Sequence, residues 1–407
     1  DPALHGPVAA LAGDDGLAAN VIPTPAAHNS SNPTTAASGR PSTAQDSRSS
    51  ARGDVTRLVQ QAAADPLSLD DDAWERLLRA EGADLDALAA TADDVRRYTV
   101  GEAISLVANR NLTSSGFRRA GRADAGEFDL ADAAAIARDA VGLGATELCV
   151  QGVIVEDPAA YVDLVRAVKD AAPSLHLHAY RPQDVWDLAD RGGLGLDGAL
   201  AALRDAGVDT MPGTGVKVLS ERVRAQVAPA DLDIDRWREA IRATHRAGFH
   251  TTSVLFYGHV ETAAERIAHL HELRAIQDET RGFSEFVPIP LPGHGVPLVA
   301  GRAPLDEHRA MVAVSRLLLT GSIPHIQIPW TRVGREDAAT LLRAGGDDLG
   351  GTLFDGRVLP DTGIEQGLEL PLADAARIAA RLFRPFRQRT TDYGTPNLSP
   401  AGVGRRA

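Results

Sequence analysis

The segment "TELCVQGVIVEDPAAYVDLVRAVKDAAPSLHLHAY" at residues 146–180 contains two short runs of strand length with a helical run between them. The strand-like runs cover 146–152 and 175–180. Between them the apolar residues recur every three or four positions, which is the period of an amphipathic helix. A strand, a helix and a second strand in this order predict a βαβ unit, whose two strands lie parallel in one sheet.

The same alternation of strands and helices continues on both sides of this segment. We expect further strands at 103–110, 208–213, 251–258, 284–290, 323–329 and 350–354. Repeated units of this size predict either a (β/α)8 TIM barrel or an open doubly wound sheet. The barrel is favoured because polar residues gather where the strands end, and because no G-x-G-x-x-G or G-x-x-x-x-G-K-[ST] loop follows the first strand.

Composition divides the chain into four parts. Residues 1–53 are rich in Ala, Ser, Thr, Pro and Gly and contain no Phe, Trp or Tyr, so we expect a disordered leader. Residues 54–100 have helical periodicity and predict an N-terminal helical segment. The TIM-barrel domain is expected at 101–386, and 387–407 are expected to form a flexible tail.

Charge and cysteine content exclude several classes of protein. The net charge of −13 over 407 residues argues against a general nucleic-acid binder, which would present a basic face. The single cysteine, Cys149, excludes an intrachain disulfide and any site that needs three or four thiolates. No run approaches the roughly 18 apolar residues of a membrane span, and no signal peptide is recognised. We therefore expect a cytoplasmic protein without nucleic-acid or membrane partners.

The exits of the predicted strands carry polar side chains, as expected at the mouth of a barrel. His259 ends one such strand as a candidate general acid or base, or as a cap of the next helix, and Tyr257 is its partner in the candidate catalytic pair. His176 and His178 share one face of a strand, where they would bind a divalent metal or line a pocket. No further metal ligands follow from the spacing, so no metal site is assigned. The residues expected to line a substrate pocket are Asn109, Asn111, His178, His325 and Gln327.

Several motifs, taken in order, resemble those of one family. They are VANRN, GATELCVQG, HLHAYRP, LRDAGVDTMPGT, YGHVET, VPIPLP, IPHIQIPW and DDLGGTL, and they resemble the CofH half of FO synthase from about residue 66 to about residue 360. That radical-SAM family of deazaflavin-cofactor biosynthesis joins the 4-hydroxybenzyl part of tyrosine to 5-amino-6-ribitylaminouracil. The resemblance implies a radical-SAM TIM barrel and a transferase. It also places a SAM-binding region at Gln151, Gly152 and Thr214.

The sequence departs from this family where an iron–sulfur cluster would be bound. The family has a C-x-x-x-C-x-x-C loop after the first strand, whereas the loop here reads LTSSGFRRAGRADAGEFDL and has no cysteine. Val153 replaces the second glycine of the family's Q-G-G motif, and Lys217 replaces the glutamate of P-G-T-A-A-E. These departures predict that the chain holds no iron–sulfur cluster and does not cleave SAM by radical chemistry, and they leave SAM binding itself open.

Three interpretations of such a chain are compatible with its sequence. In the first, the barrel binds a small molecule related to ribitylaminouracil or tyrosine and has lost or replaced the radical chemistry. In the second, it is a non-catalytic protein that pairs with an intact radical-SAM partner. The third is a decayed gene product, against which the regular helical periodicity through residue 320 argues.

Overall fold

The computed structural model describes residues 44–121, 123–124, 126–291, 303–354, 358–359 and 369–396, with the backbone alone at 44–53 and 358–359. Most of the predicted leader, residues 1–43, and the end of the predicted tail, residues 397–407, lie outside this part of the chain.

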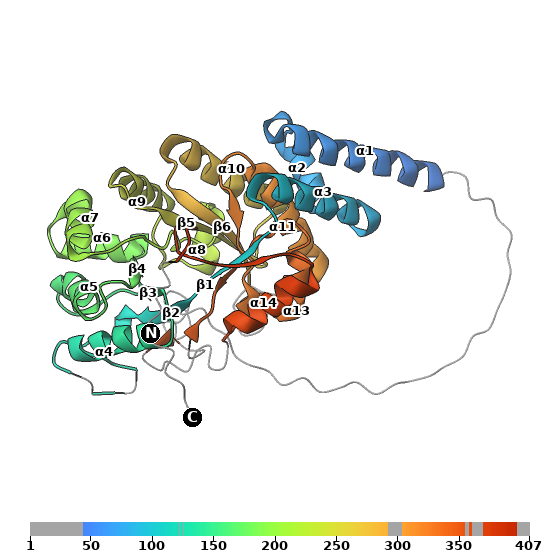
Figure 1. Cartoon of the computed structure of the whole chain (residues 1–407). Helices are drawn as coiled ribbons and strands as arrows, with labels where there is room; N and C mark the ends of the chain where they lie inside the picture. Colours follow the sequence, from blue (N-terminus) through green and yellow to red (C-terminus); the bar gives the residue numbers. More distant parts are fainter. Residues whose placement is uncertain are drawn as a thin grey trace, which may run out of the picture.

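Parallel strands form the predicted barrel (Figure 1). The first strand has two halves, β1 (Ile104–Val107) and β2 (Asn109–Thr113). It is followed around the ring by β3 (Glu147–Gln151), β4 (His176–Ala179), β5 (Thr251–Tyr257), β6 (Phe283–Pro290), β7 (His325–Ile326) and β8 (Asp348–Gly351). The ladders between them are parallel, and isolated parallel bridges at Thr210, Met211 and Gln327 join the separate ladders into a ring.

Helices cover the outside of this ring (Figure 1). Several begin with capping boxes, such as Thr262 with Glu265, in which side chains satisfy the first backbone N–H groups of the helix. The helices of the barrel are α4 (Leu130–Gly142), α5 (Ala159–Ala171), α6 (Pro182–Arg191), α7 (Gly195–Ala206), α8 (Glu221–Val227), α9 (Ile234–Arg246), α10 (Ala263–Thr280), α11 (Leu305–Leu319), α12 (Trp330–Val333), α13 (Arg335–Leu341) and α14 (Leu372–Arg381). Among the described residues no helix is both long and apolar enough to cross a membrane.

Three N-terminal helices, α1 (Ala44–Ala64), α2 (Asp71–Leu78) and α3 (Gly82–Val100), pack together against α10 and α11. Trp74 and Leu85 are fully buried in this contact. Helix α1 begins at Ala44, inside the segment that the sequence assigned to a disordered leader. The packed residues Leu58 and Val59 anchor the helix, and further turns then propagate from it at one hydrogen bond per residue.

The predicted flexible tail is wrong for its first ten residues, 387–396. Strand β10 (Phe386–Arg389) pairs in parallel with β1, on the side opposite β8. Beyond it, the ring of Tyr393 stacks on His325 with 3.5 Å between centroids. This strand was not predicted because its residues are mostly polar, and the one that is buried, Arg389, pairs with carboxylates rather than packing in an apolar core. The remaining strand, β9 (Val358–Leu359), pairs with β2.

Candidate ligand-binding site

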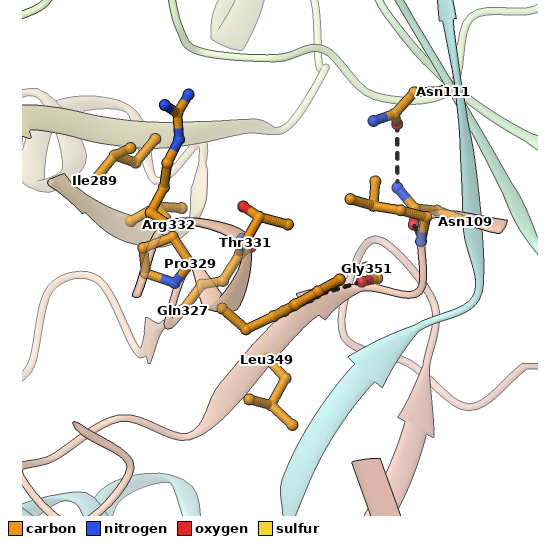
Figure 2. Close-up of a pocket in the computed structure, with 12 residues that line it drawn as sticks. Asn109, Asn111, Ile289, Gln327, Pro329, Thr331, Arg332, Leu349 and Gly351 are labelled. Atoms are coloured by element: carbon orange, nitrogen blue, oxygen red, sulfur yellow. Dashed lines mark hydrogen bonds between the residues drawn. The ribbon is translucent and has the colours of Figure 1, made fainter. Parts of the chain in front are cut away.

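A cavity of about 210 Å³ opens at the carboxyl ends of the barrel strands (Figure 2). Strands β2, β6 and β8 and the segment after β7 contribute to it, as expected for a TIM-barrel mouth. It is lined by Asn109, Asn111, Val287, Ile289, Gln327, Pro329, Trp330, Thr331, Arg332, Leu349, Gly351 and Leu353. Three of the five predicted pocket residues, namely Asn109, Asn111 and Gln327, are therefore brought together by the fold.

The amide of Asn109 is held in place by the strand exit of β8. Its oxygen accepts a hydrogen bond from the Leu353 backbone N–H at 2.9 Å, and its nitrogen donates to Asn111 Oδ1 at 3.3 Å. Gly351 makes this position available, since a Cβ there would lie 2.1 Å from Asn109 Oδ1. The neighbouring Gly350 does the same for Gln327, whose Nε2 would lie 2.6 Å from an added Cβ. The paired glycines therefore let two amides lie against the backbone at the base of the cavity.

Replacing Gly351 with alanine is expected to displace the Asn109 amide and break its bond to Leu353. We expect a stability loss of about 1–3 kcal/mol from overpacking and about five- to tenfold weaker binding of any ligand that uses this amide. Thermal unfolding and ligand titration measure both effects. Gly142→Ala in α4, where nothing lies within 4 Å of an added Cβ, is the control. Unchanged binding by Gly351→Ala would show that Asn109 does not contact the ligand.

The opposite side of the cavity combines an apolar wall with a polar helix start. Val287 and Ile289 face the cavity from β6, and Ile289 lies beside Phe256 of β5. Figure 2 shows Thr331 and Arg332, at the start of α12, across from the two asparagines. Thr331 and Arg332 were not predicted as site residues, although they directly follow the strand predicted at 323–329, where a barrel mouth is expected.

The predicted catalytic pair, Tyr257 and His259, does not line the cavity. The Tyr257 hydroxyl lies 2.7 Å from Nδ1 of His308 on α11, so its side chain points outward from the barrel. Its ring belongs to the main hydrophobic core. The His259 side chain is 1% exposed, and its Nδ1 lies 2.7 Å from the Glu261 carboxylate. Glu261 also accepts hydrogen bonds from the backbone N–H groups of Gly258 and His259. Tyr257 and His259 therefore hold the end of β5 in place and do not reach a ligand in the cavity.

His178 and His325 also lie apart from the cavity-lining residues. His178 is buried and its Nδ1 lies 2.7 Å from Thr210 Oγ1, to which His176 Nε2 is also hydrogen bonded at 2.8 Å. His325 Nδ1 lies 2.6 Å from the Asp347 carboxylate. Within the described residues no group of three or more His, Cys, Asp or Glu side chains is arranged to hold a metal ion.

Comparison with solved structures shows the fold. Methylornithine synthase PylB matches with a TM-score of 0.58 at 16% identity, over 81% of this chain and 97% of that one. HydG, a maturase of the [FeFe]-hydrogenase, matches with a TM-score of 0.62 at 13% identity, over 85% of this chain and 79% of the HydG chain. These likenesses confirm the predicted TIM-barrel fold. No family model matches the chain.

Curated sequences give a much closer match. A 5-amino-6-(D-ribitylamino)uracil–L-tyrosine 4-hydroxyphenyl transferase of Methanothermobacter thermautotrophicus is 32% identical, over 83% of this chain and 96% of its own length. The chain belongs to the FO synthase family. FO synthases of Nocardia farcinica and Mycobacterium tuberculosis are 39% and 38% identical over 86% and 84% of this chain. The chain spans 42% of the length of each of these two relatives.

The loop that would hold an iron–sulfur cluster in the FO synthase family is packed here without thiolates. It begins with the 3-10 turn Ser114–Gly116, in which Ser114 Oγ donates to the Gly152 carbonyl at 2.5 Å. Phe117 and Phe128 are buried against each other within the same loop. Since the only cysteine of the chain is Cys149 on β3, these residues do not fit a cluster that is held by three cysteines.

The three residues of the SAM-binding region expected from the FO synthase resemblance are not among those lining the cavity. Gly152 has a φ of 128°, and its N–H donates to the buried Asp184 carboxylate at 3.1 Å. Gln151 ends β3 beside Thr113. The Thr214 hydroxyl is buried and has no hydrogen-bond partner among the described residues. Gly152 therefore serves the packing of the loop after β2.

Proposed function

We propose that this member of the FO synthase family binds a small molecule related to ribitylaminouracil or tyrosine at its barrel mouth, without iron–sulfur or radical-SAM chemistry. The observation that carries the proposal is the convergence of Asn109, Asn111 and Gln327 on one cavity, in a barrel whose cluster loop has no cysteine. The name of the relative from Methanothermobacter thermautotrophicus, a ribitylaminouracil–tyrosine transferase, supplies the two ligand classes.

The chemistry of the cavity is compatible with a flat polar ring. Each side-chain amide offers both donors and an acceptor, which is what the alternating N–H and C=O groups of a uracil require. Val287 and Ile289 supply an apolar wall on which a ring can lie. Arg332 and Thr331 provide a cation and a hydroxyl on the far side. These residues would bind and orient the ligand.

A second candidate function is pairing with an intact radical-SAM enzyme. Among the large apolar side chains that are exposed in the described part of the chain, two are aromatic: Tyr98 of α3, which is 84% exposed, and Phe383 after α14, which is 96% exposed. Exposed aromatic residues are typical of protein contacts. In this case Tyr98→Asp and Phe383→Asp would abolish pairing and leave ligand binding intact.

The proposed function is tested by anaerobic reconstitution with iron and sulfide, followed by a thermal-shift screen. We expect no cluster absorbance, and stabilisation by ribitylaminouracil or tyrosine of about 2.7 kcal/mol at a ligand concentration of 100 Kd. Asn109→Ala should remove the stabilisation without unfolding the chain. Cluster absorbance together with SAM cleavage on reduction would overturn the proposal, and no response to either ligand would favour the pairing function.

A further inference from the structure

Lys217 and Asp231 form an offset ion pair beside the barrel mouth. The Asp231 carboxylate is 4% exposed, and the Lys217 ammonium lies 3.8 Å from its Oδ2, beyond hydrogen-bond distance. Within the described part of the chain, Asp231 Oδ2 has no hydrogen-bond partner. A buried carboxylate oxygen without a partner is costly, so a ligand group that donates to it would be bound favourably.

The chain contains one other lysine, and its pairing shows what a completed contact looks like. Lys169 Nζ lies 2.8 Å from Asp209 and also donates to the Leu175 carbonyl at 3.0 Å. Its side chain is 20% exposed, against 22% for Lys217. Exposure is therefore similar in the two pairs, and the difference lies in the hydrogen bonds that Lys217 and Asp231 do not make to each other.

A third polar group lies in the same chain segment. Thr214 Oγ1 is buried without a hydrogen-bond partner among the described residues, three positions before Lys217. Around Asp231, burial raises the pKa of its carboxyl, and the charges of Lys217, Arg181 and Arg224 oppose that rise. Arg181 and Arg224 are themselves paired with Asp184 and Glu221. The charges around the pair are thus balanced, so a ligand without net charge fits best.

The pair is next to the apolar wall of the cavity. The Lys217 ammonium lies 4.8 Å from the centre of the Phe256 ring, and the Phe256 N–H donates to the Lys217 carbonyl at 2.9 Å. Phe256 is the cross-strand neighbour of Ile289, which lines the cavity. A ligand whose ring lies on this wall can therefore extend a polar head group toward Lys217 and Asp231.

We propose that Lys217, Asp231 and Thr214 form a site for the zwitterionic head group of an aromatic α-amino acid. Lys217 binds the carboxylate, Asp231 Oδ2 accepts from the ammonium, and Thr214 donates a further hydrogen bond to the carboxylate. The side chain of the amino acid lies on the wall formed by Phe256 and Ile289. This assignment rests on the proposed function, because it names the groups that would recognise the tyrosine-like ligand.

Binding of L-tyrosine and two truncated analogues by calorimetry tests the assignment. In Lys217→Met the Kd for tyrosine should rise about 10- to 100-fold, whereas that for tyramine, which lacks the carboxylate, should stay within twofold. In Asp231→Asn tyrosine and tyramine should both weaken, and 3-(4-hydroxyphenyl)propionate, which lacks the amine, should not. Lys169→Met is the matched control. Equal loss for all three compounds in both variants would overturn the assignment.

The wild-type protein supplies a second readout that needs no variant. Lys169 and Lys217 are the only lysines of the chain. Reductive ¹³C-methylation retains their charge, so the Lys217 resonance should move on addition of tyrosine while that of Lys169 stays. Tyrosine binding without movement of the Lys217 resonance would overturn the assignment. No tyrosine binding would also overturn it, and a thermal shift with ribitylaminouracil would then leave the proposed function standing.

Discussion

Replacing Arg389 with alanine is expected to lower the free energy of unfolding by about 3–5 kcal/mol, the cost of leaving buried charges without a partner. The Arg389 guanidinium donates to both Asp348 oxygens at 2.5 and 2.9 Å and to Glu285 at 3.2 Å. All three side chains are at most 6% exposed. The arginine lies on β10, so its loss should also release the C-terminal strand from β1.

Denaturant unfolding of the Arg389→Ala variant measures this loss. Arg387→Ala is the matched control, since Arg387 is exposed on the same strand and should change stability by no more than about 0.5 kcal/mol. Burial raises the pKa of Glu285 to about 7 even with Arg389 in place. Without the arginine, protonation relieves part of the penalty, so the loss should be smaller at acidic pH than at alkaline pH. Equal effects of the two substitutions would show that β10 does not hold the barrel.

Acidification is expected to destabilise the fold strongly between about pH 6.5 and pH 4. Burial lowers the pKa values of His178, His245 and His269 to about 4, from an ordinary value of 6.5. Each of these imidazole rings makes its hydrogen bonds in the neutral form. His269, for example, contacts the Val254 carbonyl through Nε2 at 2.9 Å and accepts from the Leu219 N–H through Nδ1 at 3.0 Å.

The direction in which stability changes with pH follows from proton linkage. Between pH 6.5 and 4 the unfolded chain binds protons at these histidines and the folded chain does not, so stability falls as pH falls. Each lowered pKa corresponds to about 3 kcal/mol at its full extent. Glu285 acts in the opposite direction, because its raised pKa makes the folded state bind a proton between about pH 7 and 4.5. The histidines outnumber it, and the net effect remains destabilising.

Thermal unfolding at several pH values, with the proton uptake measured by calorimetry in buffers of different ionisation enthalpy, tests this expectation. His269→Gln should reduce the uptake by about one proton. His271, which is partly exposed on the same helix, is the control position for an equivalent substitution. A melting temperature that stays constant from pH 6.5 to pH 4.5 would contradict buried neutral histidines.

Strand and helix placement could be predicted because it depends on local apolar periodicity. The strands predicted at 251–258 and 284–290 are found at 251–257 and 283–290. The direction of each side chain could not be predicted with the same success. In β5, Phe256 faces the barrel interior and Tyr257 the surrounding helices, because successive side chains of a strand point to opposite faces. Tyr257 was predicted as a site residue from its residue type alone, but its side chain lies on the outer face of the barrel.

The sequence by itself determined the family, the barrel fold and the absence of cysteine from the loop after the first strand. Each of these can be recognised from the residues of short, continuous segments. Tertiary structure alone decided that β10 belongs to the barrel, where Arg389 meets Asp348 and Glu285. It also decided which polar residues share the cavity and that Lys217 lies beside Asp231. These contacts join groups far apart in the chain, and their energies depend on burial and distance, which no local pattern of residues records.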